Sequence, residues 1–259
     1  MLSTLVIGEP VRSRTHQDRS AIMAVIAYSI RSAQLCALLP SHMFERTPGE
    51  AEETACTSTM RLQPLPLEST AAPIVGYVPA ERAVRIAPIP ANILIDDSDA
   101  LDWCGATRLA APDATAGKPV YVLQHGNRMR GQVSALDAPF WIDSRSGGLV
   151  AYSGGMQITL NEAAEPQIVK SGATVLTEAG ELAGFVIAGS ELEWIVAPAE
   201  PLFARSNLSF ATNDQVREHN ARARSLDLPH GSETVGLFQH VRRFGVRVRE
   251  TSQRFSSAA

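Results

Sequence analysis

The sequence predicts an all-β protein, and three observations support this prediction. The chain of 259 residues is 45% hydrophobic and 19% charged, so it can bury a substantial core. Its apolar residues fall in short runs, which favour strands over long periodic helices. Glycine (18 residues) and proline (16 residues) are frequent, and such a composition is typical of strands joined by tight turns.

The first half of the chain contains a predicted hairpin that ends in a histidine. After a short apolar start and a polar stretch, residues 24–30 have the composition of a strand. The tripeptide at 31–33 can turn the chain, and residues 34–39 then form the antiparallel partner, followed by Pro40, Ser41 and His42. We therefore expect His42 at the end of a strand.

The rest of the first half is predicted to complete one small barrel. Residues 45–70 are rich in Glu, Thr, Ser and Pro and are expected to form an exposed loop. Short apolar segments resume at 74–78, 83–86 and 93–95. The last segment leads into an acidic cluster with four aspartates, Asp96, Asp97, Asp99 and Asp102.

The second half is predicted to contain seven short strands, enough for a second barrel or a sandwich. Residues 104–117 are loop-like and are the expected connection between the halves. The predicted strands are 119–123, 131–136, 149–152, 156–160, 174–177, 182–188 and 194–198. Beyond residue 202 the pattern changes, and the polar segment 213–225 is predicted to be a helix.

The most informative segment is residues 170–189. Ser171 and Gly172 stand at the entrance of a predicted strand, a turn follows at 178–180, and the returning strand ends at Gly189. This hairpin resembles the nucleophile hairpin of the trypsin-like (chymotrypsin-fold) serine proteases. Residues 34–44 resemble that family's strand leading to the catalytic histidine, and residues 116–135 resemble the first hairpin of its second barrel.

The resemblance covers residues 20–203 and implies a fold of two six-stranded antiparallel β-barrels. The N-terminal barrel would span 1–106 and carry His42 and the aspartate cluster. The C-terminal barrel would span 107–205 and carry Ser171. Residues 206–259 would form a short helical or irregular C-terminal extension.

The resemblance also implies a catalytic triad. A serine hydroxyl is a poor nucleophile until an imidazole removes its proton, and a carboxylate orients that imidazole. The order here, His42 first, then an aspartate of the cluster, then Ser171, is the order of the family. By family habit Asp99 is the expected third member, with Asp97 second. The implied activity is an endopeptidase acting on peptides or proteins.

Two further elements follow from the same resemblance. The backbone N–H groups of Val169 and Ser171 would form the oxyanion hole. Ile187, Ala188 and Gly189 would pair with the substrate backbone, and Gly189 would leave room for a substrate side chain.

One departure from the family pattern keeps other functions open. The family places Gly-Asp before the serine, whereas this chain has Val169 and Lys170. A β-branched valine resists unusual φ values, which would deform the oxyanion hole. The alternative is therefore a pseudoprotease, a binding or scaffold module without catalysis, and a less favoured third class is a β-barrel structural protein.

Composition argues against several other classes. The net charge of −4 gives no sequence-wide basic signature, so nucleic acid is not an expected partner. No apolar stretch is long enough to span a bilayer, and no signal peptide is recognisable, which predicts a cytoplasmic protein. Three cysteines without Cys-x-x-Cys spacing indicate neither a disulfide framework nor a zinc site. We expect no metal and no cofactor.

Overall fold

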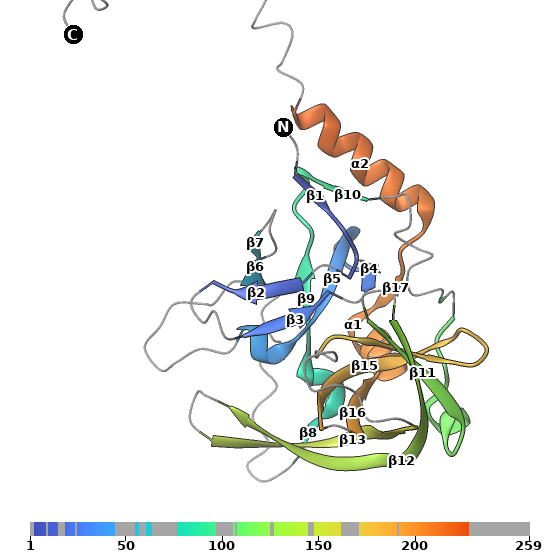
Figure 1. Ribbon diagram of the computed structural model, residues 1–259. Helices are drawn as coiled ribbons and strands as arrows, with labels where there is room; N and C mark the ends of the chain where they lie inside the picture. Colours follow the sequence, from blue (N-terminus) through green and yellow to red (C-terminus); the bar gives the residue numbers. More distant parts are fainter. Residues whose placement is uncertain are drawn as a thin grey trace, which may run out of the picture.

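The protein is mostly β-sheet, with two α-helices in the C-terminal part of the described chain (Figure 1). The computed structural model describes residues 3–8, 10–14, 19–23, 25–44, 55–56, 61–63, 77–96, 106, 108–124, 127–144, 148–161, 171–190 and 192–227.

The C-terminal half is a closed, six-stranded antiparallel barrel. Its strands are β11 (Pro119–Gln124), β12 (Asn127–Ser144), β13 (Gly148–Leu160), β14 (Thr174–Thr177), β15 (Leu182–Gly189) and β16 (Glu193–Pro198). They are hydrogen bonded in the order β12-β11-β14-β15-β16-β13, and the pairing of β12 with β13 closes the ring. A short strand, β8 (Val78–Pro79), adds to β13 in parallel. The predicted second barrel is confirmed.

The prediction of seven strands in this half was wrong, because residues 149–152 and 156–160 belong to one strand, β13. Gly154 and Gly155 lie between the two predicted strands, and paired glycines are also typical of turns. In the structure a Cβ at Gly155 would lie 2.8 Å from the ring of Phe140 on β12. The β12–β13 ladder also shifts register three times nearby. Gly155 therefore allows close packing where a long hairpin bends, and Gly154 supplies a backbone with φ +77° there.

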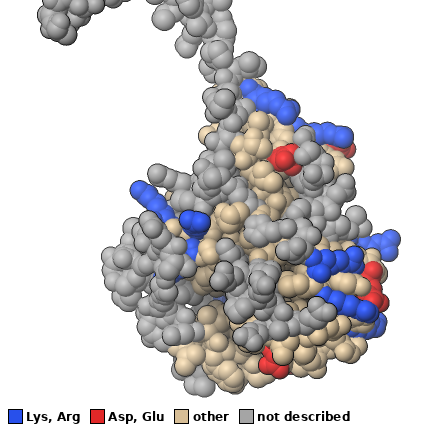
Figure 2. Space-filling model, viewed as in Figure 1, with Lys and Arg blue, Asp and Glu red and all other residues tan. Residues whose placement is uncertain are grey.

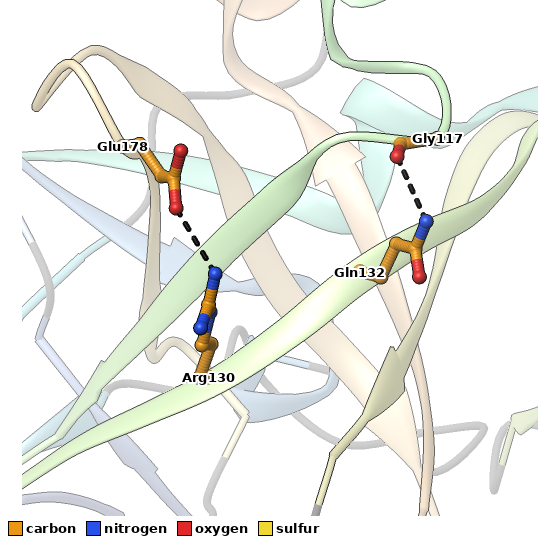
Figure 3. Close-up of polar contacts among 4 residues, drawn as sticks. All are labelled: Gly117, Arg130, Gln132 and Glu178. Atoms are coloured by element: carbon orange, nitrogen blue, oxygen red, sulfur yellow. Dashed lines mark hydrogen bonds and ion pairs between the residues drawn. The ribbon is translucent and has the colours of Figure 1, made fainter.

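Polar contacts on the outside of this barrel link neighbouring elements (Figure 3). Arg130 of β12 pairs with Glu178 of the turn after β14, at 3.3 Å. The Gln132 side-chain amide donates to the Gly117 carbonyl oxygen, at 2.8 Å, in the loop before β11. On the face in Figure 2, basic side chains on this half are interspersed with acidic ones.

The described N-terminal half consists of three sheets. One is the parallel pair β1 (Ser3–Leu5) and β10 (Ile93–Ile95); the second contains β2 (Pro10–Ser13), β3 (Ser20–Ile22), β6 (Ala55–Cys56) and β7 (Arg61–Leu62); the third contains β4 (Val25–Ser29), β5 (Gln34–Pro40), β9 (Val84–Pro88) and β17 (Leu208–Phe210). Short 3₁₀-helices are η1 (Ser41–Phe44), η2 (Ala80–Ala83) and η3 (Pro112–Thr115).

Two parts of this half differ from the expectation. The predicted hairpin is present as β4 and β5, with Ala33 at φ +51° in its turn. However, β2 and β3 lie before residue 24, largely in the polar stretch for which no strand was predicted. The segment 45–70, expected to be an exposed loop, contains β6 and β7, and most of its other residues lie outside the described ones.

The C-terminal segment returns to the N-terminal half. Helix α1 (Ala199–Ser206) follows β16 directly, and β17 then pairs with β4, so the expected extension begins by adding a strand to the first half. The predicted helix is confirmed as α2 (Asn213–Asp227). Its buried Asn220 exchanges two hydrogen bonds of 2.8 Å with the backbone of Ile95. Residues 228–259 lie outside the described ones.

The apolar core has three parts. One cluster fills the N-terminal half, and one fills the C-terminal barrel. The third contains residues of both halves, including Leu38 from β5 and Phe185 from β15. The two halves are thus packed against each other through apolar side chains. No helix in the described part of the chain is both long and apolar enough to cross a bilayer.

Candidate active site

His42 lies in a short 3₁₀ turn whose neighbouring residues are buried in the core. Helix η1 follows β5 directly, and every residue of β5 after Gln34 is buried. The next two residues of the turn, Met43 and Phe44, are buried in the core of the N-terminal half. Because its neighbours are anchored in this way, the turn holds His42 partly buried at the surface of that core.

Ser171 lies shortly before β14. The next residue, Gly172, has a backbone conformation that favours glycine. Gly172 has φ +92°, and its N–H donates to the Val186 carbonyl oxygen at 2.7 Å. A Cβ on Gly172 would collide with the carbonyl oxygen of Ile22 in β3. The Ile22 N–H also donates to the Ser171 carbonyl oxygen, at 2.9 Å. The hairpin that Ser171 precedes is therefore held directly against the N-terminal half.

The two predicted catalytic side chains meet. The Oγ of Ser171 lies 3.2 Å from Nε2 of His42, across 129 residues of sequence. This distance is within hydrogen-bond range, as a nucleophile and its general base require. The structure therefore brings together the two residues on which the sequence analysis depends.

The surroundings of His42 favour its neutral form. Burial lowers its pKa, the positive charge of Arg19 lowers it further, and a hydrogen bond to the Ser20 backbone raises it, so that the pKa is about 4. A backbone hydrogen bond raises the pKa of an imidazole when the ring N–H donates to a carbonyl oxygen, because this bond stabilises the protonated ring. Nε2 faces Ser171, so the tautomer of neutral His42 that carries its proton on Nδ1 can accept the serine proton at Nε2.

The acidic member of the predicted triad lies outside the described residues. This applies to Asp99, and also to Asp97 and Asp102. Asp96 is described directly after β10, where its N–H donates to the Leu5 carbonyl oxygen at 2.8 Å. In the described part of the chain, the imidazole has a hydrogen bond to the Ser20 backbone. The assignment of Asp99 stays a prediction.

Only one of the two residues predicted to form the oxyanion hole is described. Ser171 is described, whereas Val169 and Lys170 are outside the described residues. The proposed donation by the Val169 N–H therefore stays a prediction.

Among the described strands, none pairs with one edge of the predicted substrate strand beyond Val186, close to Ser171. The β14–β15 ladder begins at the pair Thr174 and Phe185, and Val186 bonds to Ala173 and Gly172. The last residues of β15, Ile187 to Gly189, extend past this point, and among the described strands their ladder continues with β16 alone. Their other edge can accept an extended peptide as an added strand.

Gly189 has a packing role at the end of this strand. A Cβ at this position would lie 2.6 Å from the ring of Trp194, its partner on β16. Trp194 is buried against the core of the C-terminal barrel. Gly189 was predicted to leave room for a substrate side chain, but the indole of Trp194 takes the space where its Cβ would be.

Sequence reasoning missed three contributors to this site: Arg19, Ser20 and Ile22. All three lie in or next to β3, within a stretch that carries few strand signals. Two of them act through backbone groups, which every residue possesses and no side-chain pattern reveals. The apolar run at 21–23 was the one available signal.

Comparison with solved structures identifies the fold. A *Nocardiopsis* protease (NAPase) matches with a TM-score of 0.54 at 13% identity, over 81% of this chain and 100% of that one. Protease A of *Thermobifida fusca* (13% identity) and a *Cellulomonas bogoriensis* chymotrypsin (15%) each give a TM-score of 0.49, over 81% of this chain and 100% and 99% of theirs. No protein-family model and no curated protein matches the sequence. The chain therefore has the fold of the trypsin-like (chymotrypsin-fold) serine proteases.

Proposed function

We propose that this protein is a serine endopeptidase that cleaves peptide bonds by acyl transfer. The observation that carries the proposal is the 3.2 Å contact between Ser171 Oγ and His42 Nε2. The fold itself supports a protease only by analogy. The contact adds a nucleophile and a base of the required chemistry at the required distance.

In the first half-reaction, His42 acts as general base. The Ser171 Oγ attacks the substrate carbonyl carbon while its proton passes to Nε2 of His42. The C–N bond of the tetrahedral intermediate then breaks, and the imidazolium gives its proton to the departing amine. The products are an ester on Ser171 and a new peptide amine. In the second half-reaction, water repeats these steps and releases the acid.

The substrate backbone would add to the open edge of β15. Ile187, Ala188 and Gly189 supply N–H and C=O groups along that edge, directly beyond the point where Val186 bonds to the Ser171–Ala173 segment. When an extended peptide adds as an extra strand, main-chain hydrogen bonds fix the register of the peptide, whatever its side chains are. This arrangement supports a peptide or protein substrate.

Two parts of the mechanism extend to residues outside the described ones. Asp99, with Asp97 as second choice, would stabilise the imidazolium that forms when His42 takes the serine proton. The N–H groups of Val169 and Ser171 would stabilise the charge on the substrate oxygen. Substitution of Asp99 or Asp97 by asparagine shows which aspartate belongs to the triad. The variant that loses the orienting carboxylate should have a kcat lower by several orders of magnitude.

Hydrolysis of an unstructured protein, such as denatured casein, tests the proposal. The wild-type chain should cleave it, and Ser171→Ala and His42→Ala should each lower the rate by a factor of about 1,000 or more. Ser134→Ala is a matched control, because Ser134 is an exposed serine on β12 that bonds to the Gln157 carbonyl oxygen. It should leave the rate unchanged.

The same assay distinguishes the pseudoprotease alternative. A well-folded chain that binds peptides at the β15 edge but cleaves none would fit a binding module with a deformed oxyanion hole. Cleavage that persists in Ser171→Ala would exclude Ser171 as the nucleophile. Either result would overturn the proposed function.

A further inference from the structure

Arg19 differs from the other basic residues by its burial. It is 6% exposed, and in the described part of the chain no other Lys or Arg is buried. Burying a guanidinium is unfavourable unless its donors are used. Its position directly before β3 and next to the His42 turn therefore calls for a reason.

The side chain of Arg19 contacts the backbone of His42. Its Nη1 donates to the backbone carbonyl oxygen of His42 at 3.4 Å. Its own carbonyl oxygen accepts the Ser13 N–H at 3.2 Å, so the base of the side chain is fixed by the β2–β3 hairpin. The guanidinium thus links that hairpin to the one residue of η1 whose ring contacts Ser171.

The residues that follow Arg19 contact both catalytic groups. The Ser20 backbone bonds to the imidazole, and the Ile22 N–H donates to the carbonyl oxygen of Ser171 at 2.9 Å. Four consecutive residues, 19–22, therefore hold the histidine and the serine relative to one another. We call residues 19–22 the bridging segment.

The charge of Arg19 acts on His42 in the same direction as burial. Both lower the pKa of the imidazole, and burial is the larger cause. Among the described elements, β2 and η2 pack against η1. β2 carries Arg12, and η2 carries Arg82 and Glu81. The Glu81 carboxylate is already bound by Arg205 at 2.7 Å, which weakens it as a counter-charge for the ring.

We propose that Arg19 is a positioning residue of the active site, which fixes the His42 turn through its carbonyl and keeps the imidazole in the neutral form that accepts the Ser171 proton. The inference builds on the proposed function, since it assigns a task to His42. Its consequence is a base that remains available in mildly acidic solution. The same charge disfavours the imidazolium, so it also makes His42 a weaker base.

NMR titration of His42 in the full chain tests this inference without any need for catalysis. The His42 signals are assigned by their loss in His42→Gln. In the wild type the ring should titrate near pH 4. In Arg19→Met, which keeps length and removes charge, the midpoint should rise by about one pH unit. In Arg19→Lys it should stay within about 0.3 units of the wild type.

Arg12→Met is the matched control, because it removes the same charge from an exposed position on the neighbouring β2. It should leave the titration of His42 unchanged. An unchanged midpoint in folded Arg19→Met, or an equal shift in Arg12→Met, would overturn the inference. If Arg19→Met does not fold, Arg19→Lys still decides, since a midpoint that rises despite the retained charge contradicts the proposal.

Kinetics separate this result from a failure of the proposed function. If the wild type hydrolyses casein, Arg19→Met should be about fivefold less active relative to wild type at pH 4 than at pH 8, because more of its His42 is protonated there. A purely structural role would lower the rate equally at both pH values. If no variant hydrolyses casein, the titration still tests Arg19.

Discussion

The two halves of the molecule hold the two predicted catalytic residues in different ways. The C-terminal barrel is closed by continuous strand pairing from β12 round to β13, and Ser171 stands at the entrance of one of its strands. The described N-terminal half consists of three separate sheets, and His42 lies on a four-residue 3₁₀ turn. Ser171 therefore directly precedes a ladder of backbone bonds, whereas His42 depends on a few individual contacts.

This difference locates the weak point of the site. Backbone ladders share a deformation among many bonds, but a turn moves when one or two contacts are lost. The bridging segment makes both of the contacts that matter, one to the His42 ring and one to the Ser171 carbonyl. Variants that disturb it should cost most, and variants on the outside of the closed barrel should cost least.

The largest expected effect is that of Gly172→Ala. The new Cβ would collide with the Ile22 carbonyl oxygen and would require φ +92° of an alanine. We expect the free energy of unfolding in urea to fall by roughly 3 kcal/mol or more. Gly117→Ala is the control: its φ is +66°, but nothing lies within 4 Å of the new Cβ, so about 1 kcal/mol is expected. Equal losses would contradict the contact between halves.

The next effect is a loss of stability in acid that depends on His42. Its pKa is lowered from 6.5 to about 4 in the folded chain, so the unfolded chain binds the proton more readily. The stability that comes from the neutral ring is complete above pH 6.5 and is lost as the pH falls toward 4. Between pH 7 and pH 4 the wild type should lose roughly 3 kcal/mol more than His42→Gln, measured by urea unfolding. An equal loss in both proteins would show that the ring is not held neutral.

A smaller loss of stability is expected at the contact between α2 and β10 of the N-terminal half. Asn220 is buried, and its amide makes two hydrogen bonds with Ile95. Asn220→Ala leaves those backbone groups unpaired and should cost about 2 kcal/mol in thermal or urea unfolding. Arg222→Ala on the same helix removes an exposed ion pair with Glu218 and should cost less than about 0.5 kcal/mol. A negligible cost for Asn220→Ala would mean that this half is stable without α2.

The smallest effect is predicted on the outer face of the closed barrel. Arg130 and Glu178 are both more than half exposed, at 56% and 53%. Arg130→Ala should therefore change the free energy of unfolding by less than about 0.5 kcal/mol, and 1 M salt should remove even that difference. A larger change that survives high salt would show that the barrel depends on its surface contacts, contrary to the comparison between the halves.

The sequence was sufficient to predict the features that depend on side-chain patterns. His42 could be found because it follows an apolar strand, and Ser171 because Ser-Gly precedes a hairpin with its own turn signal. Arg19 and the Ser20 carbonyl could not, since one lies in a polar stretch and the other is a backbone group. The seven-strand prediction failed at Gly154 and Gly155, because glycine marks a turn and a close packing contact alike.

The most direct test of the central claim is the reaction of the folded chain with a fluorophosphonate, followed by peptide mapping by mass spectrometry. The contact between His42 and Ser171 predicts one adduct, on Ser171, that forms at least about 1,000-fold more slowly in His42→Ala. The Ser134→Ala control should react like the wild type. A folded protein that forms no adduct, or one in which Ser171 reacts equally fast without His42, would contradict the account.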